Sequence, residues 1–395
     1  MVRLPIDDSE ASSRKQPPLN TLESILERHA ESIAWNSPGP ARYDFRSDVI
    51  TTPSMSMLAA IISTTLRDDV FHEDTTTTSF ESDISLLCGQ EAGAFTPTGT
   101  MANQLGLRTL LTQPPHAILT DVHAHILENE AGGPAFMSGA MMQAVTPSNG
   151  QYLTLEDIQS HAVLTDNVHK CPTRVIALEN TISGVVVPLE ELRRICHWAR
   201  ENGVKTHLDG ARLFEAVATG AGSLRQYSEL FDTVSLDFSK DLGAPIGAML
   251  LGSKALVAQA KRIRKSIGGG LRQAGVLTAA CRTAVNEQFG SGEWGSETAK
   301  LRWVHRQAKK VGEVWERGGG KLTKPVVTNQ VWLNLESLSV SPNEWNAIGE
   351  KYRIKLDGPR LVFHHQIGDD AVKLLGRAFE HVLSRLNNKN RRAKL

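Results

Sequence analysis

The sequence is poor in cysteine, and its cysteines are not grouped. The four cysteines of the 395-residue chain lie far apart and form no CxxC pair. This excludes a disulfide framework and a cysteine-based zinc site, and no bound metal is predicted. No stretch approaches the roughly 18 consecutive apolar residues that a transmembrane helix needs. Residues 1–20 contain no apolar run and mix acidic with basic side chains, unlike a secretory signal or a mitochondrial presequence. These absences predict a cytoplasmic protein.

The chain also has no excess of charge of either sign. Its 43 lysines and arginines balance its 43 aspartates and glutamates, which excludes a chain-wide attraction to nucleic acid or to an anionic membrane. With 41% hydrophobic and 22% charged residues, the composition is that of an ordinary globular protein. At about 150 residues per domain, the length predicts two or three domains. Neither nucleic acid nor a membrane is expected as a partner.

The pattern along the chain divides it into three parts. We expect an N-terminal arm over residues 1–42, with one amphipathic segment at 21–35, a large domain over 43–290 and a small domain over 291–395. In the large domain, short apolar runs alternate with amphipathic helices, which implies crossover connections and a mostly parallel sheet. The clearest expected strands are 117–120, 174–178, 206–208, 233–238 and 248–251.

The small domain has a different order of elements. A long helix over 298–317 precedes two expected strands, 330–335 and 361–365, and a closing helix over 370–386 follows them. This order is typical of an α+β domain. The basic tail that follows is expected to be a solvated chain end.

One segment has the pattern of an anion-binding site. Ligands of α/β sheets bind at the carboxyl ends of strands and at the starts of the helices beyond them. The run TPTGTMANQ places Gly99 in a turn that opens directly into a helix. The backbone N–H groups at such a start can bind a phosphate, although the same turn can serve as a helix cap alone.

Two further segments place charged groups after apolar strands. Asp209 ends one strand, with Arg212 three residues later, and the two could form a purely structural ion pair. Lys240 follows the next strand, where desolvation would make its amine a nucleophile able to form a Schiff base; the alternative is an ordinary surface lysine. A phosphate seat, a carboxylate for a pyridine nitrogen and a Schiff-base lysine are together what pyridoxal phosphate requires.

These segments belong to a longer series of motifs that resembles a known family. Eight segments, in order between Phe45 and Gly275, resemble the motifs of the threonine aldolases: FRSDVITTP, EDTTTTSFE, TPTGTMANQ, HILENEAGG, ALENTISGVVVPLEEL, HLDGARLFEA, FSKDLGAPIG and GGGLRQAG. That family consists of fold-type I pyridoxal-phosphate enzymes. The resemblance therefore implies an α/β large domain like that of aspartate aminotransferase, with a mostly parallel sheet, and a smaller C-terminal α+β domain.

The resemblance also implies roles for individual residues. Lys240 would bind pyridoxal 5'-phosphate as a Schiff base, and Asp209 would pair with the pyridine nitrogen. Gly99 and Thr100 would bind the phosphate, and His125 would stack on the pyridine ring. These five residues would form the cofactor site together with Arg212 and Arg272.

The remaining implied residues concern the substrate and a second subunit. Arg272 matches a family arginine that reaches the phosphate from the neighbouring subunit, which implies a homodimer or homotetramer with its active site at the interface. Ser47, Arg212 and Arg360 match positions that bind the amino-acid carboxylate and the phenolic oxygen of the cofactor. His169 corresponds to a histidine near the substrate hydroxyl group.

The implied reaction is the cleavage of L-threonine or L-allo-threonine to glycine and an aldehyde. His169, or a water held by His169 and His125, would take the proton of the β-hydroxyl group. The Cα–Cβ bond would then break, and the cofactor ring would take up the negative charge. The expected enzyme is a carbon–carbon lyase.

Departures from the family pattern keep other activities open. Phe71 and His72 replace the usual Tyr-Gly, Ile182 lies in a loop that usually carries a histidine, and Asp241 replaces a small residue. Some fungal relatives of threonine aldolases are alanine racemases that serve peptide natural products, and this is the main alternative. It would need Lys240 and a second base across the ring. A transaminase and a non-catalytic scaffold are further alternatives.

Overall fold

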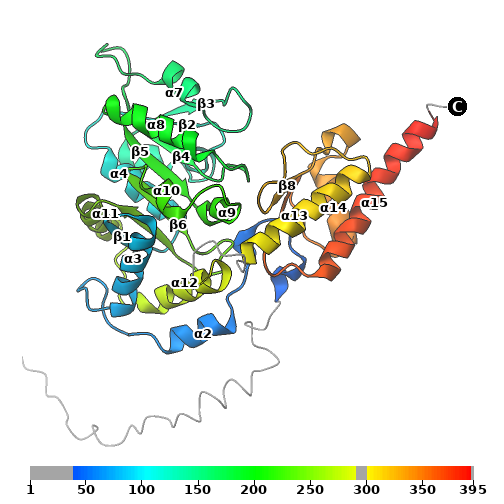
Figure 1. The fold of residues 1–395 in the computed structure, drawn as a ribbon, viewed down its shortest axis with the longest axis horizontal. Coiled ribbons are helices and arrows are strands. Elements are labelled where there is room, and N and C mark those ends of the chain that lie inside the picture. Colours follow the sequence, from blue (N-terminus) through cyan, green and yellow to red (C-terminus); the bar gives the residue numbers. More distant parts are fainter. Residues whose placement is uncertain (1–38, 291–299, 393–395) are drawn as a thin grey trace, which may run out of the picture.

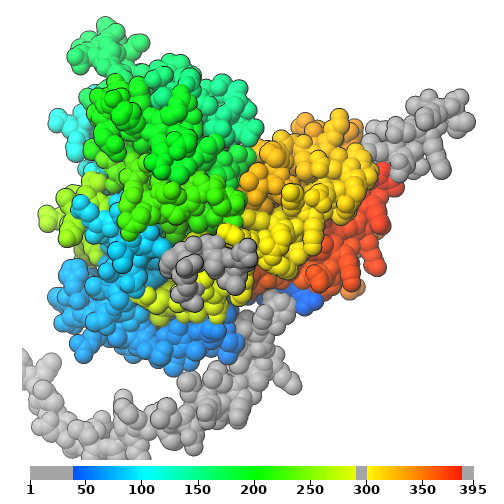
Figure 2. Space-filling model, in the orientation of Figure 1, coloured from blue at the N-terminus to red at the C-terminus, as the bar shows by residue number. Residues whose placement is uncertain are grey.

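The computed structural model describes residues 39–290 and 300–392. The segment 21–35 and most of the arm expected over 1–42 lie outside the described residues. Figure 1 shows a larger α/β body, blue to yellow-green, and a smaller body, yellow to red, beside it. Figure 2 shows the two bodies in contact. In the described part of the chain, no helix is both long and apolar enough to cross a bilayer.

The larger body is built on a seven-stranded sheet. In spatial order the strands are β1 (Ala92–Thr96), β7 (Ala248–Gly252), β6 (Thr233–Asp237), β5 (Lys205–Gly210), β4 (Thr173–Glu179), β2 (Ala117–Asp121) and β3 (Met141–Val145). Strand β7 runs antiparallel to both of its neighbours, and the other pairs are parallel. The prediction of a mostly parallel sheet is confirmed. All five expected strands are present, and β1 and β3 were not predicted.

The antiparallel direction of β7 determines which strands end at the same edge of the sheet. Strands β1 and β6 both run antiparallel to β7, so they are parallel to each other. Strand β6 is also parallel to β5, and β5 to β4. The residues that follow these four strands therefore lie at the same edge, which is where parallel sheets place their ligands.

Helices cover both faces of the sheet. On one face lie α4 (Gly99–Leu110), with α6 (Gly133–Ser138) beside it, and α11 (Lys254–Ser266). The other face is covered by α3 (Thr75–Cys88), α8 (Leu189–Glu201), α9 (Leu213–Ala218), α10 (Leu224–Ser228) and α12 (Gly275–Gln288). Short connections contain α2 (Met55–Ile62), α5 (His125–Glu128) and α7 (Leu155–His161).

The side chains of each strand alternate between these two layers. In β4, Val175 and Ala177 pack in a cluster with residues of α4, whereas Ile176 and Leu178 pack in the cluster that contains α8. This is the two-residue period of a strand that is buried on both faces. Each such aliphatic side chain stabilises the fold by about 1.5–3 kcal/mol.

Local sequence explains where the helices begin. Helix α8 follows Pro188 and buries one stripe that includes Leu192 and Ile195, as its 3.6-residue spacing predicts. Helix α4 begins after Thr98, whose side-chain oxygen accepts a hydrogen bond from the backbone N–H of Met101 at 3.1 Å. This cap satisfies one of the free N–H groups of the first turn.

The smaller body has its own core. It contains α13 (Lys300–Arg317), β8 (Gln330–Trp332), the 3-10 helix η4 (Glu336–Leu338), α14 (Pro342–Lys351), β9 (Arg360–Val362) and α15 (Asp369–Arg392). Strands β8 and β9 pair antiparallel. Trp315 contacts Trp345 and Phe379 edge to face in the core. The expected helices and strand pair are found, with the strands shorter than predicted.

Residues 43–51, which we call the N-terminal strap, connect the two bodies. The strap begins at the end of the 3-10 turn η2 (Pro40–Tyr43) and contains a second 3-10 turn, η3 (Asp48–Ile50). The backbone N–H of Phe45 donates to the Lys355 carbonyl at 3.0 Å, and the Val362 N–H donates to the Phe45 carbonyl at 2.8 Å. The Phe45 ring is buried in the smaller core. We therefore propose that the smaller unit includes residues 40–46, which the sequence analysis assigned to the arm and the large domain.

Candidate active site

One side of α4 lies directly over the ends of β5 and β6. Gly99, Asn103 and Gly106 recur at the spacing of one helix face. A Cβ added to Gly106 would lie 2.8 Å from an atom of the His207 ring, and one added to Gly99 would lie 2.8 Å from Asp237 Oδ2. Glycine at these positions lets the helix approach the two strands closely.

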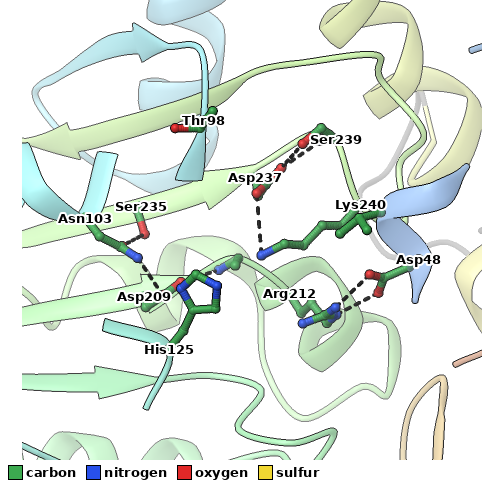
Figure 3. Close-up of polar contacts among 12 residues, drawn as sticks. Asp48, Thr98, Asn103, His125, Asp209, Arg212, Ser235, Asp237, Ser239 and Lys240 are labelled. Carbon is green, nitrogen blue, oxygen red and sulfur yellow. Dashed lines mark hydrogen bonds and ion pairs between the residues drawn. The ribbon is translucent and has the colours of Figure 1, made fainter. Parts of the chain in front are cut away.

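Asn103 organises the buried polar groups beneath α4. Its Nδ2 donates to Asp209 Oδ2 at 2.7 Å and to Glu130 Oε1 at 2.9 Å. Its Oδ1 accepts from the Ser235 hydroxyl at 2.6 Å and lies 3.1 Å from His207 Nε2. Burial lowers the pKa of His207 to about 4, so this ring is neutral. Asn103 thereby fixes the orientation of the Asp209 carboxylate (Figure 3).

Asp209 is held at the end of β5 with one side open to the site. Its Oδ1 accepts the Ala211 N–H at 3.0 Å, and only 4% of the residue is exposed. Ligand atoms of His125, Glu130 and Asp209 lie within 4.8 Å of one another. The Asn103 amide donates to both carboxylates, so hydrogen bonds account for this grouping.

His125 lies beside Asp209 at the start of α5. Its Nδ1 is 2.9 Å from Glu130 Oε1, and 37% of its side chain is exposed. Its backbone N–H donates to Glu179 Oε2 at 2.9 Å. The hydrogen bond to Glu130 and the charge of Asp209 raise the pKa of His125. Burial and the charge of Asp209, which is opposite on β5, raise the pKa of Glu179 to about 7.

Replacing Glu130 with glutamine should lower the pKa of His125. The variant keeps the shape of the side chain but loses the charge that favours the imidazolium. NMR titration of the His125 ring measures this change. The raised pKa of His125 contributes stability that is fully present below pH 6.5, the ordinary pKa of histidine, and is lost as the pH rises through the raised value. The free energy of unfolding of E130Q should therefore fall more at acidic than at alkaline pH.

Glu128→Gln is the matched control for this titration. Glu128 pairs with His123 rather than with His125, and its loss removes the same charge from the same short segment. An unchanged His125 titration in E130Q, or an equal change in E128Q, would contradict the assignment.

Lys240 extends into the same space from the loop that follows β6. Its Nζ lies 3.5 Å from Asp237 Oδ2, and 14% of its side chain is exposed. The Thr51 hydroxyl donates to the Lys240 carbonyl at 3.0 Å, which ties the loop to the N-terminal strap. In Figure 3, the amine end of Lys240 points towards Asp237 and the space between Asp209 and Arg212.

Arg212 is held by a buried carboxylate. Its Nε and Nη2 donate to the two oxygens of Asp48, both at 2.6 Å. Burial opposes ionisation of Asp48, but Arg212 lowers its pKa below the usual value. Asn329 Nδ2 donates to Asp48 Oδ2 at 3.1 Å and to Asp241 Oδ1 at 2.7 Å. Burial and the charge of Asp48 raise the pKa of Asp241.

The implied substrate residues Ser47 and Arg360 lie beside this pair. Ser47 immediately precedes Asp48, and its Oγ accepts the Val49 N–H at 3.4 Å. Arg360 Nη2 donates to the Arg46 carbonyl at 3.2 Å. Burial and the nearby charge of Arg212 lower the pKa of Arg360.

Two implied site residues lie apart from this group within one chain. Arg272 pairs with Asp68 at 2.9 Å, and 60% of its side chain is exposed. His169 lies on the exposed loop before β4, where its backbone N–H donates to Asn167 at 3.0 Å. Among the departures from the family pattern, Phe71 is exposed and Ile182 is buried.

Sequence reasoning missed three residues of the site. Asn103, Glu130 and Asp48 hold the functional side chains, yet none of them directly follows an expected strand. Each lies within a segment that carried the resemblance. The spacing of Asn103, four residues after Gly99, was the one available signal for the α4 face.

The group of residues fits pyridoxal phosphate at three points. Among the described residues, the N–H groups of Gly99 and Thr100 form no hydrogen bond, so they can donate to a phosphate. Asp209 offers a fixed carboxylate for the pyridine nitrogen, and Lys240 offers an amine for the aldehyde. Gly99 lies beside Asp237, whose Oδ2 is 3.5 Å from Lys240 Nζ, and Figure 3 shows Lys240 and Asp209 beside the same space.

Comparison with known proteins gives a consistent result. A family model for beta-eliminating lyases matches residues 44–337. Alanine racemase TOXG of Cochliobolus carbonum is 53% identical over 94% of this chain and 95% of its own. The low specificity L-threonine aldolase of Saccharomyces cerevisiae is 43% identical over 84% of each. The structure of Leishmania major threonine aldolase aligns with a TM-score of 0.70 at 19% identity, over 87% of this chain and 99% of that one.

Proposed function

The chain belongs to the beta-eliminating lyase family, and we propose that within it the chain is a threonine aldolase, which cleaves L-threonine and L-allo-threonine to glycine and an aldehyde. It is a fold-type I enzyme that depends on pyridoxal phosphate. The observation that carries the proposal is the position of Lys240 and Asp209 at the ends of neighbouring strands, beside the free N–H groups of α4.

Pyridoxal phosphate, when bound, supplies an electron sink for the negative charge that bond cleavage leaves on Cα. Lys240 would hold the cofactor through its aldehyde group. Asp209 keeps the pyridine nitrogen protonated, because Asn103 and the Ala211 N–H hold its carboxylate in place. Gly99 and Thr100 hold the phosphate with their N–H groups.

Arg360 is the best candidate to bind the substrate carboxylate. Arg212 already forms a two-point ion pair with Asp48. Within the described ranges, Arg360 forms no ion pair and contacts the Arg46 carbonyl and the Trp332 ring. Its planar guanidinium suits a carboxylate. Ser47 lies next to Asp48 at this position, and Arg212 would bind the phenolic oxygen of the cofactor.

We assign the base that takes the proton of the β-hydroxyl group to His125. It lies beside Asp209, and Glu130 stabilises the charge it acquires. His169 lies on an exposed loop of the same chain, so its expected part in proton transfer is assigned to His125 here. A positioned histidine of this kind typically contributes about 10²–10⁴-fold to the rate.

Alanine racemization is the second candidate, and one observation favours it: the 53% identity to alanine racemase TOXG over 94% of the chain. The same residues could catalyse racemization, with proton transfer at Cα in place of bond cleavage. Lys240 would take or return the proton of Cα on one face, and His125 would act on the other, with no Cα–Cβ bond broken.

Product analysis separates the two activities. We expect the purified enzyme with pyridoxal phosphate to release acetaldehyde and glycine from L-threonine or L-allo-threonine, and to leave L-alanine unchanged. Chiral chromatography and an aldehyde assay measure both. D-alanine from L-alanine, with no acetaldehyde from either threonine isomer, would select the racemase and overturn the aldolase proposal.

We further propose a cytoplasmic homodimer or homotetramer with its active site at the subunit interface. Arg272 supports this, since 60% of its side chain is exposed and its ion pair within the described chain is with Asp68, which leaves it accessible to a second subunit. Phe71, on the same segment as the partner of Arg272, has 71% of its surface exposed. Exposed apolar side chains of this size favour a contact with another subunit.

A further inference from the structure

Asp237 is a buried carboxylate placed between the two anchors that would hold the cofactor. It is the last residue of β6 and 6% of its side chain is exposed. Its Oδ2 lies 3.5 Å from Lys240 Nζ and faces the Gly99 turn, where an added Cβ would come within 2.8 Å of it. Figure 3 shows it between Thr98 and Lys240.

The orientation of this carboxylate is fixed by Ser239. Its Oδ1 accepts hydrogen bonds from the Ser239 N–H at 2.8 Å and the Ser239 hydroxyl at 2.7 Å. The remaining oxygen, Oδ2, is thereby directed to Lys240 and Gly99. The negative charge of Asp237 consequently acts on both anchors at short range.

We propose that Asp237 is a positioning residue that weakens the binding of pyridoxal phosphate by opposing it at both anchors. The proposal rests on the proposed function. At the Gly99 turn, the Asp237 carboxylate lies beside the glycine whose N–H group would bind the phosphate, and two negative charges close together in a partly buried site repel each other. No arginine of the same chain pairs with Asp237 among the residues described.

At Lys240, the negative charge of Asp237 also weakens cofactor binding. To join the cofactor, the ammonium must give one proton to solvent, and the neutral Nζ then attacks the aldehyde carbon. A C=N bond replaces the C=O bond, and the oxygen leaves as water. The ion pair with Asp237 must be given up in this exchange, so the carboxylate opposes loading at the aldehyde as well as at the phosphate.

Asp237→Asn tests the proposal with the least change of shape. Asparagine keeps an oxygen that can accept both hydrogen bonds from Ser239. We expect D237N to bind pyridoxal phosphate at least about tenfold more tightly, because removal of one close charge is worth 1.4 kcal/mol or more. Absorbance titration of the cofactor-free protein measures the dissociation constant without any assay of activity.

Two smaller ligands test the two anchors, Lys240 and the Gly99 turn, one at a time. Pyridoxal, which lacks the phosphate, reports on Lys240, and inorganic phosphate reports on the Gly99 turn. Both should bind more tightly to D237N than to the unchanged protein. Increased salt should reduce the difference for phosphate, because ions screen the repulsion.

Asp232→Asn is the matched control. Asp232 lies just before the other end of β6, where it pairs with Lys205, and its substitution removes the same charge far from Lys240. Asp237→Ser removes the charge with a smaller side chain and guards against a packing effect of asparagine. Binding of any of the three ligands that is unchanged or weaker in both Asp237 variants overturns the proposal. Failure of the unchanged protein to bind pyridoxal phosphate would instead contradict the proposed function.

Discussion

Replacing Lys240 with alanine should abolish covalent binding of pyridoxal phosphate and lower the turnover of threonine by at least about 10³-fold. The Lys240 side chain reaches the space beside Asp209 in Figure 3. Its removal takes away the bond to the aldehyde and the amine that can exchange a proton with Cα. The visible absorbance band and the mass of the borohydride-reduced protein measure the covalent bond, and steady-state rates measure the turnover.

Lys205→Ala is the control for this experiment. Lys205 starts β5 and forms an exposed ion pair with Asp232, so it should keep both the absorbance band and the activity. A Lys240→Ala protein that still carries the reduced cofactor adduct, at any lysine, would contradict the assigned position of the Schiff base.

Replacing Asp48 with alanine should produce the largest loss of stability, about 3–5 kcal/mol in the free energy of unfolding. The change leaves the Arg212 guanidinium buried without its partner, since 13% of the Arg212 side chain and none of Asp48 is exposed. It also removes one acceptor of Asn329. Urea denaturation of the cofactor-free protein measures the difference.

The exposed pair between Glu190 and Arg193 provides the comparison. These residues lie on the surface of α8, three apart, where an ion pair contributes little to stability. Glu190→Ala should therefore leave the urea midpoint nearly unchanged. A loss in D48A no greater than the loss in E190A would show that the buried pair does not hold the N-terminal strap in place.

Sequence patterns predicted the parts of the fold that have distinct local signals. Asp209 and Lys240 each follow a run of apolar residues, and such a run at the end of a parallel strand is a strong positional signal. Strand β1 has the sequence Ala-Gly-Ala-Phe-Thr, and β3 contains two methionines and a glutamine. Neither has the run of branched aliphatic residues that indicates a strand, so both were missed.

The supporting residues of the site depend on contacts between distant segments. Asn103 is 106 residues from Asp209 in the sequence, and Asp48 is 164 residues from Arg212. No periodicity within a single segment reports such contacts. Contacts between subunits are a further kind of contact that the pattern of one segment does not report. The expected partner of Arg272 is a phosphate bound by a second subunit, so its role stays a prediction.

The N-terminal strap has a consequence for how the chain can be cut or re-joined. Tyr43 and Phe45 hydrogen-bond to the smaller body, Asp48 neutralises Arg212, and Thr51 holds the Lys240 loop. Nine consecutive residues thus clamp parts that come from both halves of the polypeptide. A proteolytic nick or a circular permutation inside 43–51 would break the strap that joins the Lys240 loop to the C-terminal unit, whereas fusions placed upstream of residue 40 leave the strap uncut.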